Sequence, residues 1–391
     1  MNIPLRLVQM KKILIIHNKY RNLGGEDIAV DNEIELLSKY YELETLHFTN
    51  EIKNYFQQSV SFFTNKNKNS VTKLEKVLSS FNPDYAYVHN TWFKASPYIF
   101  NTLEKHNVST IVKLHNFRFD CTKSYFSSKH LKGQKTCPGC GMNKESTGIF
   151  NKYYKESILK SAIIIRYGKK YFKILNKKNL KILTLTNFHK NYLENMGFNK
   201  NNIFVHPNYL NSISNTSYNP KSGYIVYAGR VSLEKGVDKL IDSYLKIENP
   251  DFKLKIVGNG PEYRELKKEY EDEMINFMGE VTNETSREII NSSRAVVTAT
   301  NLYEGQPTLL CEASSSGIPS IFPTNGGISE FFPSEYVLSY DPEKNDNLVD
   351  KLNILNSSDL LKKVSQENKK YILKMLEESN YIYKFESILN E

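Results

Sequence analysis

Short apolar runs alternate with longer amphipathic segments along most of the chain. The runs are four to six residues long and end at glycine or polar residues, as is typical of buried strands in a parallel sheet. The clearest are Lys12–His17, Tyr85–Asn90, Thr110–His115, Tyr224–Tyr227, Lys253–Val257 and Ala295–Thr298. Because strands alternate with helices, the pattern predicts an α/β fold whose ligands bind at the carboxyl ends of the strands.

Glycines follow several of these runs. Gly229, Gly258 and Gly279 come after strands of the second half, and Gly24-Gly25 precedes an amphipathic segment after the first strand. Glycine lets a ligand approach the backbone, and the N–H groups at a helix start bind anions. These positions therefore predict phosphate-binding loops.

Arg230 and Lys235 flank the loop that follows the strand at 224–227. Two cations beside a glycine loop at a helix start favour a diphosphate ligand. Solvated basic residues around a helix cap would account for either residue alone, but less well for both.

Two glutamates are separated by seven residues in the segment from Glu304 to Glu312. Pro307 suits the first turn of a helix and Gly317 suits its C-terminal cap, so Glu312 should lie on a helix and Glu304 in the loop before it. Hydroxyl groups of a sugar or ribose would donate to both carboxylates. The same ligand would accept hydrogen bonds from the backbone N–H groups at the helix start, which are those of Gly305, Gln306 and Thr308. An amphipathic helix alone gives the same spacing.

The order of these motifs resembles family 4 of the retaining glycosyltransferases. It runs through Gly229-Arg230, Glu234-Lys235-Gly236, Val257–Glu262, Glu304–Pro307 and Ala313–Pro319, within Gly229–Gly327. The resemblance implies a GT-B architecture, in which two Rossmann-like domains face each other across a cleft. It also implies that the second domain holds most of the nucleotide-sugar donor and the first domain holds the acceptor.

The resemblance implies roles for individual residues. Arg230 and Lys235 would neutralise the donor diphosphate, Glu304 would hold the donor sugar, and Glu312 would bind the ribose hydroxyls. His115 resembles the active-site histidine of the family, although a histidine at a strand end is also a common scaffold group. The expected donor-binding residues are Gly24, Gly25, Gly229, Gly258, Gly279, Glu280, Val281, Gly305, Gln306, Pro307, Thr308 and Glu312.

The resemblance and the composition together predict the domain boundaries. Residues 1–207 would form the acceptor-side domain with an insertion at 117–151, and the Asn-, Ser- and Tyr-rich segment 208–222 would be the linker. Residues 223–371 would bind the donor, and residues 372–391 would form a helix that crosses back to the first domain. A polar patch at 64–70 predicts a surface loop.

Three of the four cysteines lie in the insertion. Cys137-Pro-Gly-Cys140 has the spacing of a zinc knuckle, and Cys121 and His130 complete a candidate set of four ligands. Reduced thiols or a labile disulfide are the alternatives. Cys311, in the predicted helix of Glu312, is expected to be a small buried hydrophobe.

The two halves of the chain differ in charge. Residues 1–205 contain 32 Lys and Arg and 15 Asp and Glu, a net charge of +17, whereas the remaining residues contain 20 and 28, a net charge of −8. A basic acceptor domain would be attracted to anionic lipid headgroups, although a lysine-rich composition alone would also make it basic. No recognised nucleic-acid-binding module is present, so nucleic acid is not an expected partner.

No apolar segment is long enough to span a bilayer, and the first residues lack the order of a signal peptide. We therefore expect a cytoplasmic protein, with peripheral contact at the inner face of the membrane. Residues 1–10 are expected to be a frayed extension before the first strand, and Met10 is an alternative start.

The sequence lacks an Asp-x-Asp metal motif in the expected place, so we expect no cofactor for catalysis, with fixed cations stabilising the leaving diphosphate. The resemblance implies retaining transfer of a sugar, from a UDP- or GDP-sugar, to a saccharide acceptor that is lipid-linked. Capsule, lipopolysaccharide and exopolysaccharide assembly are the expected settings. A GT-B epimerase or phosphorylase, and a non-enzymatic nucleotide-sugar-binding partner, are the alternatives.

Overall fold

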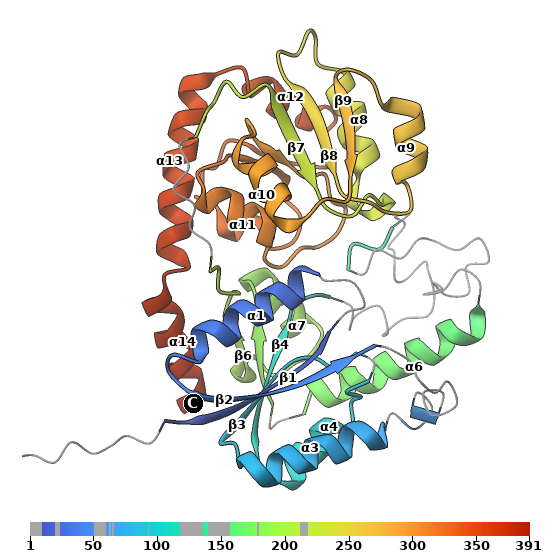
Figure 1. Ribbon diagram of the computed structural model, residues 1–391, viewed down its shortest axis with the longest axis vertical. Coiled ribbons are helices and arrows are strands. Elements are labelled where there is room, and N and C mark those ends of the chain that lie inside the picture. Colours follow the sequence, from blue (N-terminus) through green and yellow to red (C-terminus); the bar gives the residue numbers. More distant parts are fainter. Residues whose placement is uncertain are drawn as a thin grey trace, which may run out of the picture.

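The computed structural model describes residues 10–19, 24–50, 60–61, 64, 66–92, 94–117, 136–139, 157–177, 180–211 and 218–391. It forms two lobes, one above the other (Figure 1). Each lobe contains a six-stranded sheet in which all strand pairs are parallel. The predicted α/β class and GT-B architecture are confirmed, as the structural comparisons below also show.

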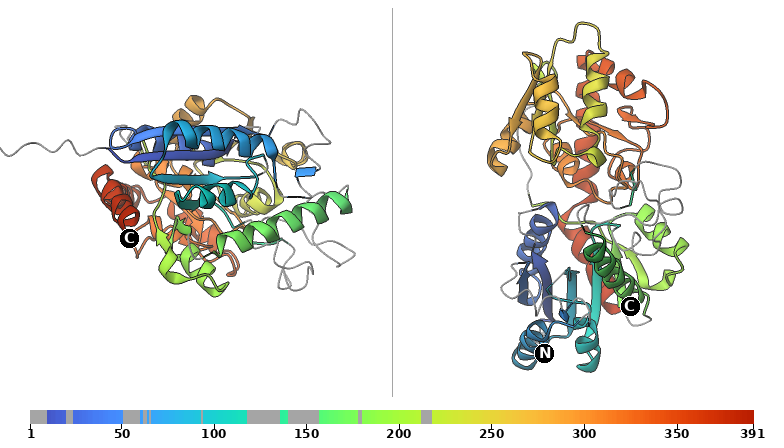
Figure 2. Two further views of the ribbon diagram at one scale, coloured as in Figure 1. Left: turned by 90° about the horizontal axis from the view of Figure 1, so that it is seen from below. Right: turned by 90° about the vertical axis from the view of Figure 1, so that its right-hand side faces the viewer.

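The first sheet has the strand order β2-β1-β3-β4-β5-β6. Its strands are β1 (Lys12–Lys19), β2 (Glu42–Thr49), β3 (Tyr85–Asn90), β4 (Ser109–Leu114), β5 (Leu180–Thr184) and β6 (Ile203–Val205). Among the residues described for this lobe, the helices with defined bounds are α1 (Gly25–Leu37), α3 (Lys68–Phe81), α4 (Ile99–Lys105), α6 (Ile158–Leu175) and α7 (Asn187–Asn195). They cover both faces of the sheet, as the two views in Figure 2 show.

The second sheet has the order β12-β11-β10-β7-β8-β9. Its strands are β7 (Tyr224–Ala228), β8 (Lys253–Val257), β9 (Ile275–Gly279), β10 (Val296–Val297), β11 (Ser320–Pro323) and β12 (Ser339–Tyr340). The helices are α8 (Val237–Leu245), α9 (Tyr263–Tyr270), α10 (Asn283–Asn291), α11 (Thr308–Ser315), α12 (Asn347–Ile354) and α13 (Ser358–Met375). The apolar core of this lobe is separate from the two core clusters of the first.

The predicted surface loop at 64–70 is wrong at Thr64, which is helical, and in its last three residues, because α3 begins at Lys68. The Asn67 side chain accepts hydrogen bonds from the N–H groups of Asn69 and Ser70 and so caps the helix. The polar residues of this patch start a helix whose buried face, with Val71 and Leu74, comes later in the sequence.

The last helix, α14 (Glu378–Asn390), packs on the first lobe although α13 packs on the second. Figure 1 shows the two helices in succession along one side of the molecule. Phe385 of α14 is fully buried, and its ring lies 5.3 Å from that of Tyr87 on β3. The His206 ring lies 4.1 Å from the Tyr381 ring of the same helix. This burial fixes the C-terminal segment to the sheet of the first lobe.

Polar contacts also join the lobes near their facing ends. The Glu330 carboxylate of the second lobe accepts hydrogen bonds from the N–H groups of Asn187 and Phe188, both at 2.7 Å, and so caps the start of α7. The Gln306 side chain accepts from the Asn208 N–H at 2.5 Å and donates to the Asn208 carbonyl at 3.1 Å. These contacts hold the facing ends in a defined orientation.

We expect Phe385→Ala to lower the free energy of unfolding of the first lobe by about 3–5 kcal/mol, because a buried ring is replaced by a cavity. Urea unfolding monitored by the fluorescence of Trp92, the only tryptophan, would measure this. Tyr383→Ala is the matched control, because that ring on the same helix is 75% exposed and its loss should cost less than about 0.5 kcal/mol. Equal effects of the two substitutions would contradict the seating of α14.

Candidate functional site

A cavity of about 500 Å³ lies between the two lobes. Loops after β1 and β4 line it from the first lobe, and loops after β7 and β10 and the start of α11 line it from the second. Predicted site residues in the lining are Gly24, Gly25, His115, Gly229, Lys235, Glu304, Gln306, Pro307 and Thr308. Residues from distant parts of the sequence therefore meet at the carboxyl ends of both sheets.

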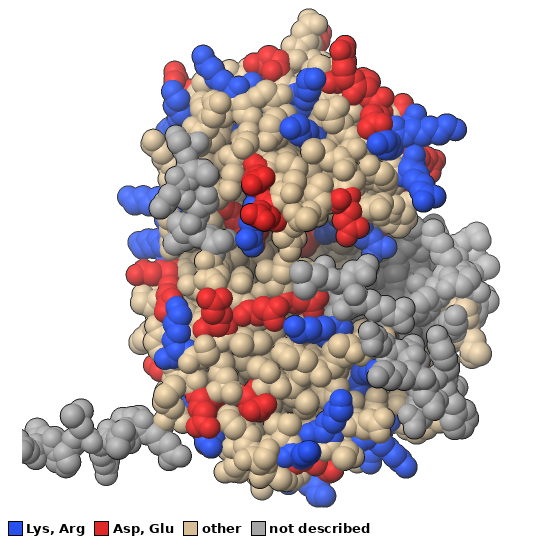
Figure 3. Space-filling view, viewed as in Figure 1, with Lys and Arg blue, Asp and Glu red and all other residues tan. Residues whose placement is uncertain are grey.

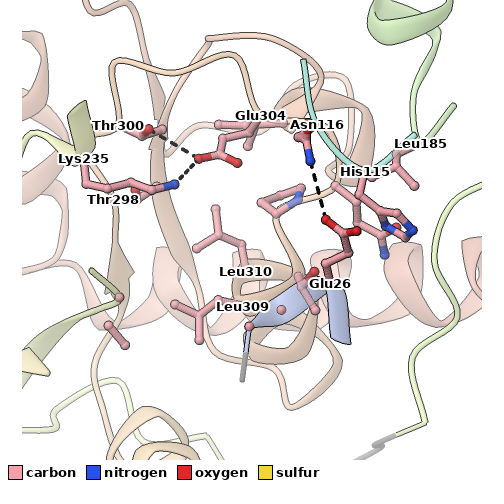
Figure 4. A pocket seen from close by; sticks show the side chains of 18 of the residues that line it. Glu26, His115, Asn116, Leu185, Lys235, Thr298, Thr300, Glu304, Leu309 and Leu310 are labelled. Carbon is pink, nitrogen blue, oxygen red and sulfur yellow. Dashed lines mark hydrogen bonds and ion pairs between the residues drawn. The ribbon is translucent and has the colours of Figure 1, made fainter. Parts of the chain in front are cut away.

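Lys235 and Glu304 form an ion pair in this cavity, with Nζ 2.5 Å from Oε1. Figure 4 shows the two side chains pointing toward each other, with Thr300 beside them. Thr300 Oγ1 lies 3.4 Å from the same carboxylate oxygen. Both charged side chains are about one quarter to one third exposed, so a ligand can reach either charge.

The main chain of Glu304 is held by the loop after β11. The Glu304 carbonyl accepts a hydrogen bond from the Gly327 N–H at 2.8 Å. Gly326 has φ +66°, and a Cβ there would lie 2.6 Å from that carbonyl oxygen. Only glycine fits this position, so the loop fixes the point from which the Glu304 carboxylate enters the cavity.

The N-terminus of α1 faces the same cavity from the first lobe. Gly24 and Gly25 line it, and the Asp27 carboxylate accepts a hydrogen bond from the Gly24 N–H at 3.0 Å. Glu26 also lines the cavity, with an oxygen 3.5 Å from the Asn116 amide nitrogen, opposite Glu304 in Figure 4. On the face seen in Figure 3, acidic side chains follow the boundary between the lobes.

Arg230 is not part of the cavity lining, although its neighbour Gly229 is. Its side chain is exposed and makes no ion pair with a described residue. Gly258 packs directly behind the same loop, since a Cβ there would lie 2.0 Å from the Gly229 carbonyl oxygen. The Gly279 carbonyl accepts a hydrogen bond from the Gly258 N–H at 2.7 Å. Gly258, Gly279, Glu280 and Val281 are outside the lining.

α11 starts at Thr308, with Pro307 as its N-cap, and ends in a glycine cap at Gly317. The Ile318 and Gly317 N–H groups bond to the carbonyls of Ala313 and Ser314, which is a Schellman motif. The helix is therefore placed as the sequence indicates. Pro307 was expected in the first turn of this helix, whereas in the structure it is the residue just before that turn.

Gly305 and Glu312 do not line the cavity. Gly305 packs against Leu185 of the first lobe, with a Cβ position 3.1 Å from that side chain. Burial raises the pKa of the Glu312 carboxyl, and the charge of Arg287 partly offsets this shift. The structure thus places Glu312 on α11, as predicted from the sequence, and outside the residues that line the cavity.

Burial lowers the pKa of each histidine near this end of the first lobe. The set comprises His17, His47, His89, His115, His189 and His206, and for His189 the pKa falls to about 3. His115 Nε2 is 3.0 Å from His89 Nδ1, and the rings are stacked. The predicted site residue His115 is thus part of a buried histidine cluster.

Of the four candidate zinc ligands, Cys121, His130 and Cys140 lie outside the described residues. Cys137 is buried, and its turn contacts the second lobe, where the Tyr303 N–H donates to the Pro138 carbonyl at 2.6 Å. Among the described residues no group of metal-ligating side chains is present. The zinc site stays a prediction.

Sequence reasoning missed several residues that shape the site. Tyr303 packs its ring against Phe188 and Phe117 of the first lobe, at 5.2 and 6.0 Å, directly before Glu304. Thr298, Thr300 and Asn116 line the cavity. Their only signal in the sequence is proximity to a strand end or to Glu304, which does not distinguish them from other loop residues.

Comparison with known proteins supports the class that this fold and cavity indicate. Residues 211–371 match the family described as Glycosyl transferases group 1, so this part of the chain is a group 1 glycosyltransferase domain. The resemblance found in the motifs is confirmed at that level and at the level of the GT-B fold.

Individual relatives agree with this assignment. The chain is 29% identical over 195 residues to the amylovoran biosynthesis glycosyltransferase AmsD of Erwinia amylovora. The aligned region covers 47% of this chain and 54% of AmsD. The chain therefore spans about half the length of this curated relative.

Two solved structures share the fold along nearly the whole chain. Sucrose-phosphate synthase of Thermosynechococcus elongatus superposes with a TM-score of 0.70 at 15% identity, covering 97% of this chain and 98% of that one. HepE of Anabaena in complex with UDP-glucose superposes with a TM-score of 0.67 at 13% identity, covering 97% of this chain and 100% of that one.

Among the described residues, no helix has the length and apolar character needed to cross a bilayer.

We expect stability to fall as the pH is lowered below about 6.5. Each buried histidine stays neutral in the folded protein but takes up a proton in the unfolded chain. Below about pH 6.5 the free energy of unfolding therefore falls by about 1.4 kcal/mol per pH unit for each such histidine. Urea unfolding would measure the difference in free energy of unfolding between about pH 7.5 and about pH 5.5. For His189→Phe this difference should be smaller than for the wild type by about 1.4 kcal/mol. His106→Gln, at an exposed position, should leave the difference unchanged. An unaltered pH effect in His189→Phe would contradict this account.

Proposed function

We propose that the protein is a glycosyltransferase that moves a sugar from a nucleoside diphosphate sugar to a hydroxyl of a saccharide acceptor. The observation that carries this proposal is the Lys235–Glu304 pair, which faces the N-terminus of α1 across one cavity. A cation and helix N–H groups suit a diphosphate, and a carboxylate beside them suits sugar hydroxyls. The group 1 domain and the glycosyltransferase AmsD support the same class.

The donor would replace the internal ion pair with two separate interactions. Lys235 would turn to the diphosphate, and Glu304 would accept hydrogen bonds from the sugar. The donor must break this ion pair, and both charged groups then act from positions at the cavity that they hold before it binds. Arg230, exposed beside Gly229, would approach the diphosphate from the outer side of the loop.

We infer that transfer retains the anomeric configuration and needs no metal. The bond from the anomeric carbon to the diphosphate oxygen breaks, and the acceptor oxygen bonds to that carbon on the same face. The acceptor proton passes to the leaving phosphate. Lys235, Arg230 and the Gly24-Gly25 loop at the start of α1 would stabilise the charge that develops on the diphosphate. UDP or GDP is the nucleotide we expect, and HepE was solved with UDP-glucose.

Lys235→Ala should weaken nucleotide binding about ten- to a hundredfold, because one charged hydrogen bond is lost. Calorimetry with UDP, GDP, ADP and dTDP would measure this and select the nucleotide. Lys239→Ala is the control, since the exposed Lys239 pairs with Asn301 outside the cavity. If both variants bind like the wild type, the cavity is not the diphosphate site.

Glu304→Gln should keep nucleotide affinity but lower the transfer rate by roughly 10²–10³-fold, because the carboxylate acts on the sugar. Product analysis with each sugar nucleotide, with and without saccharide acceptors, would measure this. Product formed without an acceptor would favour an epimerase or phosphorylase. Tight binding with no turnover for any donor would favour a non-enzymatic partner of a polysaccharide assembly complex.

We also propose that the acceptor is lipid-linked and that α6 lies against an anionic membrane. Arg166, Lys170 and Lys173 are exposed at spacings of four and three, which places them on one face of the helix. Leu159, near the start of α6, is 69% exposed, and α6 contains no acidic residue. Capsule, lipopolysaccharide or exopolysaccharide assembly at the inner face of a bacterial membrane would supply such an acceptor.

Replacing Arg166, Lys170 and Lys173 with glutamine should abolish sedimentation with vesicles that contain anionic lipid, since each charge contributes about 1 kcal/mol. The wild type should not bind vesicles of zwitterionic lipid. The control carries the same charge change at Lys362, Lys363 and Lys370, which are exposed on α13 of the second lobe. Equal losses in the two triple variants would indicate a general charge effect and would contradict a role for α6.

A further inference from the structure

A chain of buried polar groups lies behind the cavity, between the first sheet and α1. β3 and β4 are parallel neighbours, with Tyr87 opposite Ile111. Because side chains alternate along a strand, Tyr87 and His89 of β3 share a face with Lys113 of β4 and with His115 just after it. Glu33 of α1 packs on this face, and the side chains of Glu33 and Lys113 are fully buried.

Glu33 contacts three of these groups. Its carboxylate pairs with Lys113 Nζ, accepts a hydrogen bond from the Tyr87 hydroxyl at 2.9 Å, and lies 3.9 Å from His89 Nε2. Interactions of a buried carboxylate are strong because little water screens them. At this distance the two atoms are not hydrogen-bonded, and His89 Nε2 has no hydrogen-bond partner among the described residues. The negative charge of the nearby carboxylate nevertheless favours the tautomer of His89 that carries its proton on Nε2.

The proton on His89 decides the state of His115. A hydrogen bond between two neutral imidazoles requires one nitrogen to donate and the other to accept. If His89 carries its proton on Nε2, its Nδ1 is the acceptor, so the 3.0 Å contact is a hydrogen bond donated by Nε2 of His115. His115 Nδ1 then has a free lone pair.

Burial lowers the pKa of both rings well below the ordinary histidine value, so both stay neutral at physiological pH. His115 Nδ1 is buried and has no hydrogen-bond partner among the described residues, and His115 lines the cavity. The two nitrogens of an imidazole point in nearly opposite directions, so Nδ1 faces away from His89. A buried acceptor without a partner is costly, and a ligand hydroxyl would satisfy it.

We propose that His89 is a positioning residue that, under the influence of Glu33, fixes the tautomer of His115 so that Nδ1 accepts a hydrogen bond from a hydroxyl of the donor sugar. The inference rests on the proposed function for the identity of the ligand. It assigns Glu33 and His89, neither of which lines the cavity, an effect on transfer through His115.

The first test compares two substitutions at one position. The side-chain oxygen of Asn can take the place of Nδ1 as an acceptor, whereas Leu fills similar space without one. His89→Leu should lower kcat roughly 10- to 100-fold, as for other groups that orient a functional histidine, with little change in nucleotide affinity. His89→Asn should restore kcat to within a few-fold of the wild type.

His47→Leu is the control for loss of a histidine from the same lobe, at a half-buried position. It lies on β2 and shows no hydrogen bond to His115 among the described contacts. Its kcat should stay close to that of the wild type if it folds. Equal kcat values for His89→Leu and His89→Asn, or a wild-type value for His89→Leu, would overturn the proposal.

The second test reads the tautomer directly and needs no sugar donor. ¹⁵N NMR of histidine-labelled wild-type protein, assigned with His115→Asn, distinguishes a protonated ring nitrogen from an unprotonated one. The proposal requires a protonated Nε2 and an unprotonated Nδ1 in His115. A protonated Nδ1 would overturn it, even if the protein proves to be a glycosyltransferase. If no donor is turned over, the proposed function fails while the NMR result still decides the tautomer.

Discussion

The last helix of the chain holds the two sheets in the arrangement that forms one site, because it is buried in the lobe that it does not follow in sequence. α13 belongs to the core of the second lobe, and α14 places Phe385 and Tyr381 into the core of the first. Since the two helices are packed in separate apolar cores and only two residues separate them, this segment limits how far the lobes can move relative to each other. The cap that Glu330 supplies to α7 and the pairing of Gln306 with Asn208 add directional contacts nearer the cavity.

Charges in the cavity are arranged before any ligand enters. Lys235 and Glu304 neutralise each other, and the Gly24 N–H at the start of α1 donates a hydrogen bond to the Asp27 carboxylate. Each group therefore has a partner that a ligand must replace, which favours ligands that offer both a phosphate and hydroxyls. An isolated anion would satisfy Lys235 but leave Glu304 without a counter-charge.

The sequence predicted the parts of the fold that depend on local pattern. Strands such as Lys253–Val257, and the glycine loops after them, appear where the apolar runs and glycines place them. The loop of Gly229 and the helix that ends at Gly317 follow from the requirement for glycine at a close backbone contact or a left-handed turn. The start of α3 was missed because polar capping residues look like a loop before the apolar face begins.

Contacts between the lobes could not be predicted in the same way. Gln306 was expected to offer its backbone N–H to a ligand, and nothing in the sequence indicated that its side chain bonds to the backbone of Asn208. Arg230 and Glu312 were expected to bind the diphosphate and the ribose of the donor, and both lie outside the residues that line the cavity, so these roles stay predictions. These placements depend on the approach of two separately folded sheets, and no short segment carries that information.

The contact between Pro138 and Tyr303 has a consequence for how such proteins diversify. The turn at 136–139 comes from the first lobe, and its carbonyl holds the backbone N–H of the residue next to Glu304. The insertion and the loop that contributes the cavity carboxylate thus share one hydrogen bond. An exchange of this insertion between relatives would change the position of Glu304 as well, so the two lobes cannot vary as independent modules in this region.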